Sequence, residues 1–87
     1  MDQNAREFLR RLLTTPGPSG FEQAAALVWR EEAMSFADDV EWDVLGNSYA
    51  VVKGTGGPKV VIEGHIDEIG FIVTHIDEDG FLWFDKI

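Results

Sequence analysis

The 87-residue chain contains no cysteine, which excludes disulfide bonds, thiolate metal sites and a cysteine nucleophile. It has no apolar stretch near its N-terminus of the kind found in signal peptides. No apolar run approaches the roughly 20 residues that a membrane helix requires. These absences fit a cytoplasmic protein, which is the location we expect.

Basic residues are also scarce, with seven Lys and Arg against 16 Asp and Glu and a formal net charge of −9. Such a surface attracts neither phosphate backbones nor acidic lipids, so we expect no nucleic-acid or membrane partner. A hydrophobic fraction of 45% is ample for a core. At this length, however, a chain buries only about 60–65% of its unfolded surface.

Two helices are predicted in the first half of the chain. Apolar residues recur at helical spacing over residues 2–14, and an alanine-rich second helix is expected over about 21–37. The intervening prolines and glycines cannot continue a helix. Ser19 stands three residues before Glu22, which predicts a capping box that opens the second helix.

The second half of the chain has β character. Residues 40–43 and 49–53 predict two antiparallel strands, because the connection between them is short. Residues 59–64 include Val60, Val61 and Ile62 without polar alternation, which is typical of a strand covered on both faces. We expect these three side chains in the core of an α/β layer. Residues 71–84 predict a further β-hairpin.

His65 and Asp67 follow directly after the expected buried strand. Residues two apart in an extended backbone point to the same side, so these side chains should project together. In open α/β sheets, sites form at the ends of such strands. A metal-binding imidazole usually donates its second ring N–H to a carboxylate. Taken alone, however, the pair also fits a His–Asp hydrogen bond without metal.

Three segments of the chain together carry a family resemblance. They are Pro-Gly-Pro-Ser-Gly-Phe-Glu at 16–22, Asp-Val-Leu-Gly-Asn at 43–47 and Gly-His-Ile-Asp-Glu-Ile-Gly at 64–70. In this order and spacing, the sequence resembles the metallopeptidases called glutamyl or tetrahedral aminopeptidases, some of which carry the name endoglucanase. The resemblance covers the whole chain and corresponds to about the N-terminal quarter of such an enzyme.

The resemblance implies an α/β fold in two parts. Residues 1–70 would belong to a three-layer catalytic domain, and residues 71–87 would begin an inserted β domain that mediates dimerisation. Dimers of the family build larger hollow assemblies, so a homo-oligomer is expected for the complete protein.

The resemblance also implies an activity, the removal of N-terminal residues from peptides by two divalent metal ions, zinc or cobalt. His65 would be a metal ligand, and Asp67 would orient it and tune the bound water. The remaining ligands and the glutamate general base would lie downstream of residue 87. The chain alone is therefore expected to be inactive.

Two alternatives stay open. The chain could be a truncated, non-catalytic α/β interaction module, since 87 residues cannot complete such a metallopeptidase. It could also belong to a glycoside hydrolase, whose chemistry needs two positioned carboxylates, with Glu63 and Asp67 as the available pair. His75 lies on a different expected strand and matches nothing in the family pattern, so we interpret it as structural.

Overall fold

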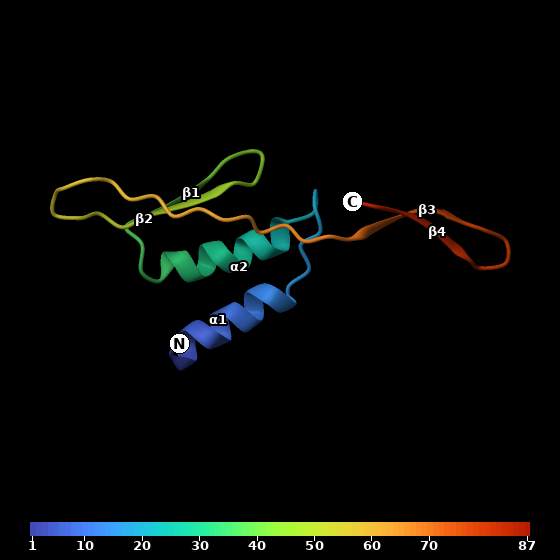
Figure 1. Cartoon of the computed structure of the whole chain (residues 1–87), viewed down its shortest axis with the longest axis horizontal. Helices are drawn as coiled ribbons and strands as arrows, with labels where there is room; N and C mark the ends of the chain where they lie inside the picture. The colour runs from blue at the N-terminus through green and yellow to red at the C-terminus, as the bar shows by residue number, and fades with distance from the viewer.

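The structure is a computed structural model that describes all residues from 1 to 87 (Figure 1). Two helices precede two separate β-hairpins. These elements are α1 (Gln3–Thr14), α2 (Gln23–Met34), β1 (Asp39–Trp42), β2 (Ser48–Val51), β3 (Phe71–Ile76) and β4 (Leu82–Lys86). Both predicted helices and both predicted hairpins are confirmed. Neither helix has the length and apolarity needed to cross a membrane.

Local signals fix the two ends of α1. Asp2 precedes the helix, and its side chain accepts a hydrogen bond of 2.7 Å from the backbone N–H of Ala5, which satisfies one of the free amides of the first turn. At the other end, the backbone N–H and the hydroxyl of Thr15 both donate to the carbonyl of Arg11. Pro16 then prevents the helix from continuing.

The small core of the chain is centred on α2. Its alanines 25, 26 and 33 are the buried apolar residues of the structure, and the fourth buried residue is Gly17. Side chains this small let neighbouring backbone approach closely. Larger apolar residues of the same region stay outside this core, since Phe36 is 64% exposed.

One arginine fastens α2 to the first hairpin. β1 and β2 pair antiparallel, with Trp42 opposite Ser48. Arg30 of α2 donates from Nε to the hydroxyl of Ser48 at 2.8 Å, and its guanidinium carbon lies 4.7 Å from the centre of the Trp42 ring. This distance is within the range of a cation–π interaction. The helix and the hairpin therefore form one unit.

Each hairpin is closed by an aspartate at the end of its first strand. Asp43 and Asp77 each accept hydrogen bonds from the backbone N–H groups two and four residues later. Each also accepts one from an aromatic side chain six residues later, Tyr49 in the first turn and Trp83 in the second. The indole N–H of Trp83 is the main cause that lowers the pKa of Asp77. Hydrogen bonding within the hairpin thus gives a structural reason for the acidic turn over residues 77–80.

The second hairpin projects from the rest of the molecule as an arm (Figure 1). β3 and β4 pair antiparallel with a bulge between Val73 and His75, and every residue of both strands is exposed. The molecule measures 64 × 30 × 17 Å, and its radius of gyration is 17.5 Å. A compact chain of this length would have a radius of gyration of about 12 Å. Much apolar surface is therefore left without cover.

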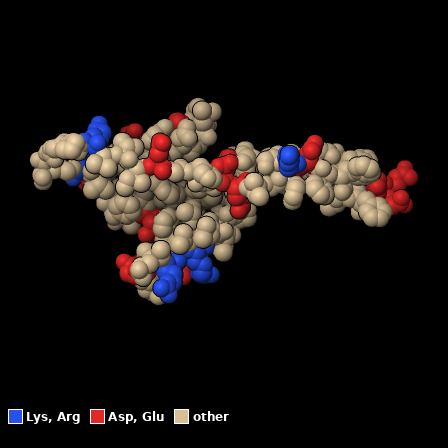
Figure 2. Space-filling view, viewed as in Figure 1, with Lys and Arg blue, Asp and Glu red and all other residues tan.

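Charge is distributed unevenly over this shape. Figure 2 shows Lys and Arg gathered over α1 and acidic atoms at the tip of the arm, where residues 77–79 are Asp, Glu and Asp. Away from its tip, the arm carries two charged residues, Asp85 and Lys86 of β4. Most of the exposed residues of the two arm strands are apolar.

The prediction of a buried central strand over 59–64 is wrong for this structure. The segment belongs to no strand, and Val60, Val61 and Ile62 are 79%, 76% and 95% exposed. No backbone-to-backbone hydrogen bond involves residues 54–66. A strand exists only where a neighbour pairs with it, and this chain supplies no neighbour here. The apolar run therefore stays extended and unpaired.

Candidate metal-binding site

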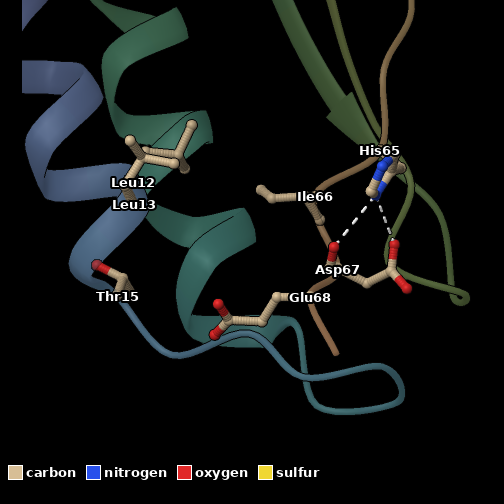
Figure 3. Close-up of a pocket in the computed structure, with 7 residues that line it drawn as sticks. All are labelled: Leu12, Leu13, Thr15, His65, Ile66, Asp67 and Glu68. Atoms are coloured by element: carbon tan, nitrogen blue, oxygen red, sulfur yellow. Dashed lines mark hydrogen bonds and ion pairs between the residues drawn. The ribbon is translucent and has the colours of Figure 1, made fainter. Parts of the chain in front are cut away.

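His65 and Asp67 lie together, as the two-residue spacing predicts. The Nδ1 atom of His65 is 2.9 Å from Oδ1 of Asp67 and 3.1 Å from the Asp67 backbone carbonyl oxygen. Figure 3 shows the two side chains on one side of the extended segment, with Ile66 between them directed toward the helices. The extended backbone thus produces the pair without a regular strand.

The partners of His65 determine which ring nitrogen carries the proton. Nδ1 faces a carboxylate oxygen and a carbonyl oxygen, and both of these can only accept hydrogen bonds. Nδ1 is therefore the donor, and in the neutral ring Nε2 keeps its lone pair. No hydrogen bond uses Nε2, and the His65 side chain is 86% exposed. The imidazole thus presents its free nitrogen outward, as a metal-binding histidine does.

The second oxygen of Asp67 is held by a residue from the other end of the chain. The hydroxyl of Ser19 donates to Oδ2 of Asp67 at 2.6 Å. This hydrogen bond, followed by the one from His65, lowers the pKa of Asp67 below its ordinary value. Asp67 is therefore ionised at neutral pH and accepts from the imidazole.

The predicted capping role of Ser19 is wrong. Glu22 occupies the capping position of α2, and no side chain caps the helix by a hydrogen bond. Glu22 itself accepts a hydrogen bond of 2.6 Å from the backbone N–H of Gly20. The Ser19 hydroxyl is directed to Asp67 because the loop that carries it is docked against the site.

The docking of this loop depends on reciprocal contacts with Glu68. The backbone N–H of Glu68 donates to the carbonyl of Gly17 at 2.9 Å, and the N–H of Ser19 donates to the carbonyl of Glu68 at 3.1 Å. The Glu68 carboxylate also accepts from the N–H of Gly17 at 3.0 Å. Pro18 and Glu68 thus form a short parallel bridge between segments 50 residues apart. This bridge sets Ser19 beside Asp67.

Two glycines let the docked loop approach its neighbours. A Cβ atom on Gly17 would lie 3.0 Å from the Cβ of Ala25, and one on Gly70 would lie 2.9 Å from the Cβ of Pro18. A Cβ at Gly70 would force its neighbours to shift, and one at Gly17 would press closely on Ala25. Gly17 and Gly70 therefore have a physical role in bringing the two segments together.

An open pocket of about 250 Å³ adjoins the pair (Figure 3). It is lined by Leu12, Leu13, Thr15, His65, Ile66, Asp67 and Glu68. No group of three or more His, Asp or Glu residues is assembled to hold a metal ion. Glu63 is exposed and makes no hydrogen bond with the pair. The donor chemistry of His65 and Asp67 fits one histidine ligand with its orienting carboxylate, which is part of a metal centre.

Sequence comparison finds similarity to aminopeptidases. Residues 46–87 match the family described as M42 glutamyl aminopeptidase. FrvX of Escherichia coli, grouped by its name with aminopeptidases, is 42% identical over 81 residues, which are 93% of this chain and 22% of FrvX. The lysyl aminopeptidase of Pyrococcus furiosus is 39% identical over 77 residues, which are 87% of this chain and 22% of that enzyme.

Structure comparison gives a consistent result. The crystal structure of a TET aminopeptidase from a marine sediment archaeon of the Thaumarchaeota matches with a TM-score of 0.86 and 36% identity. The match covers 95% of this chain and 23% of that structure. The unusual extended arrangement of the chain is therefore one that occurs in an experimentally determined enzyme.

The fold is a mixed α/β arrangement, and the candidate site is a histidine oriented by a carboxylate. More particularly, the chain is similar to the M42 glutamyl aminopeptidases, as the motifs predict. It spans between a fifth and a quarter of the length of the relatives described above.

Proposed function

We propose that the chain supplies the first metal ligand of a two-metal aminopeptidase that removes N-terminal residues from peptides. One observation carries the proposal. The Asp67 carboxylate holds Nδ1 of His65, while Nε2 is left free and exposed. Family membership supports the same conclusion, because the relatives are aminopeptidases by name.

Each residue of the pair would have a distinct role. His65 would bind one ion through Nε2, and Asp67 would fix the ring orientation and raise the basicity of the imidazole through the Nδ1 hydrogen bond. When bound, two divalent ions, zinc or cobalt, supply an activated water and polarise the scissile carbonyl. The other ligands and the general base would come from outside the 87 residues, because no further ligand cluster is assembled here.

The domain organisation proposed for the chain has two parts. Residues 1–70 would form the start of a three-layer catalytic domain in which the unpaired segment at 59–64 becomes an inner strand. Residues 71–87 would start an inserted β domain used in dimerisation and in a larger assembly. The exposure of Val60, Val61 and Ile62, and of both strands of the arm, supports this proposal, since these surfaces need cover. We expect the complete protein in the cytoplasm.

The test of this function is hydrolysis of amino-acid nitroanilides with added zinc or cobalt. We expect activity from the full-length protein that carries this chain and none from the isolated 87 residues. A catalytic zinc normally needs three protein ligands, and one imidazole supplies only a small part of the binding free energy of about 10 kcal/mol or more seen for full ligand sets. The isolated chain should therefore also retain no stoichiometric metal after gel filtration.

Two results would contradict this proposal. Turnover by the isolated chain that survives further purification would show that the site is complete within 87 residues. Inactivity of a folded, metal-loaded full-length protein would favour the non-catalytic interaction module instead. A full-length protein boiled before assay serves as the control for contaminating metal-catalysed hydrolysis.

The exposed arm predicts self-association of the isolated chain. Phe71, Trp83 and Phe84 are 71%, 61% and 58% exposed, and a two-stranded hairpin alone is only marginally stable in water. Apolar patches of this kind mark surfaces that pair with another chain. We expect light scattering coupled to gel filtration to give a mass above the 9.7 kDa of one chain, rising with concentration.

The matched control replaces apolar arm residues with polar ones while leaving the turn intact. Phe71→Ser with Phe84→Ser removes the aromatic pair of the arm, whose ring centres are 4.8 Å apart, and should lower the measured mass. A well-folded, monomeric unmodified chain at high concentration would overturn the prediction.

A further inference from the structure

We propose that Ser19 is a positioning residue, which fixes the Asp67 carboxylate and through it the His65 imidazole that receives the metal. The inference rests on the proposed function, since it takes His65 to be a ligand. Its geometric basis is that Asp67 uses one oxygen for each partner. Oδ2 accepts from Ser19 Oγ at 2.6 Å, and Oδ1 lies 2.9 Å from His65 Nδ1.

A carboxylate held at both oxygens has a defined plane. The torsion that turns an aspartate carboxylate is broad, so a single hydrogen bond leaves the group free to rotate. Hydrogen bonds to an ionised carboxylate are short and strong, and the Ser19 contact has the length expected for one. The Ser19 hydroxyl therefore locks the plane in which Oδ1 meets the imidazole N–H.

The position of the hydroxyl is itself fixed by backbone contacts. The bridge between Pro18 and Glu68 places Ser19 alongside Asp67, and the Ser19 N–H is bonded to the Glu68 carbonyl. Ser19 is only partly exposed, and its hydroxyl has no other hydrogen-bond partner. The hydroxyl does not cap α2, so its one interaction in the structure is the hydrogen bond to Asp67 at the site.

A purely structural role would make a different prediction. If the Ser19–Asp67 bond only joined the loop to the extended segment, its loss would lower stability and leave the imidazole unchanged. A positioning role instead changes the tautomer of His65 and the affinity for metal. The His65 tautomer and the metal affinity are therefore measured together with thermal unfolding.

The decisive variants are Ser19→Thr and Ser19→Val in the full-length protein that carries this chain. Thr and Val have nearly the same shape, and only Thr keeps the hydroxyl donor. Zinc affinity is measured by competition with a chelator, and the tautomer of His65 by ¹⁵N NMR of the metal-free protein. Ser19→Ala gives the simple deletion, and Ser35→Ala removes a hydroxyl that bonds only to the Glu32 carbonyl in α2, away from the site.

We expect Ser19→Val and Ser19→Ala to weaken zinc binding by about 10-fold, the lower end of the range for groups that orient a metal ligand. The share of His65 rings protonated at Nε2 should rise in both variants. Ser19→Thr and Ser35→Ala should keep the affinity and tautomer of the unmodified protein. If Ser19→Ala fails to fold, the Thr and Val pair still decides the result.

The inference is overturned if Ser19→Val and Ser19→Thr bind zinc equally well and show the same tautomer. Failure of the proposed function has a separate indicator. If His65→Ala keeps its full complement of zinc, then His65 is not a ligand, whatever the Ser19 variants show. Loss of zinc in His65→Ala together with equal Ser19 variants refutes the Ser19 role alone.

Discussion

Replacement of His65 with Ala in the full-length protein should reduce nitroanilide hydrolysis by more than about 100-fold. The reason is that His65 has a free ring nitrogen, Nε2, while its other ring nitrogen, Nδ1, is held by Asp67. Loss of a group that only orients a metal ligand lowers metal affinity or activity by about 10- to 100-fold. Loss of the ligand itself should lower activity by more than that. Metal content should fall together with activity.

Asp67→Asn and His75→Ala are the comparison variants for this prediction. Asp67→Asn keeps the shape of the side chain but weakens its hydrogen bond with Nδ1 of His65. It should therefore lower metal affinity or activity by about 10- to 100-fold. His75 is a β3 residue opposite Trp83 and has no part in the site, so its removal should leave metal content unchanged. Full activity in a folded His65→Ala protein would refute the ligand assignment.

Replacement of Gly70 with Ala should be the most damaging change outside the His–Asp pair. The new Cβ would lie 2.9 Å from the Cβ of Pro18, whose ring cannot rotate away. Overpacking of this kind typically costs about 1–3 kcal/mol. The loop must shift to relieve it, which separates Ser19 from Asp67. We expect zinc affinity to fall by about 10- to 100-fold, as for loss of a group that orients a ligand.

Gly54→Ala is the matched control, because a Cβ at Gly54 would meet nothing within 4 Å. A second-site change tests the cause directly. Pro18→Gly removes the clashing carbon, so it should restore part of the affinity lost in Gly70→Ala. The effect of Gly70→Ala should also shrink in a Ser19→Val background, because both changes act on one contact and are not additive. Equal zinc affinity of the Gly70→Ala and Gly54→Ala proteins would contradict the proposed close packing.

Local sequence patterns determined most of the elements and the pairing within the site. The polar and apolar spacing at 2–14 and the turn residues near 43–47 and 77–80 act over a few neighbours, and α1 and both hairpins form where these patterns predict. The His65–Asp67 contact is equally local, because an extended backbone places side chains two apart on one side. The three motif segments then predicted the similarity to the M42 glutamyl aminopeptidases.

Contacts between distant segments were decided by the tertiary structure. From the sequence, Ser19 could serve either in a capping box or at the site. Only the bridge from Pro18 to Glu68 directs its hydroxyl to Asp67. Its place in the 16–22 segment, one of the three that carry the family resemblance, was the one sequence signal that it had another use. Val60 is the opposite case. The β-branched residues around it favour a buried strand, but they cannot supply the partner strand that it needs. Hydrogen-bonded pairing and burial both need a second segment alongside the first. Within these 87 residues, the loop at Ser19 has such a partner in the segment at Glu68, and the apolar run at Val60 has none.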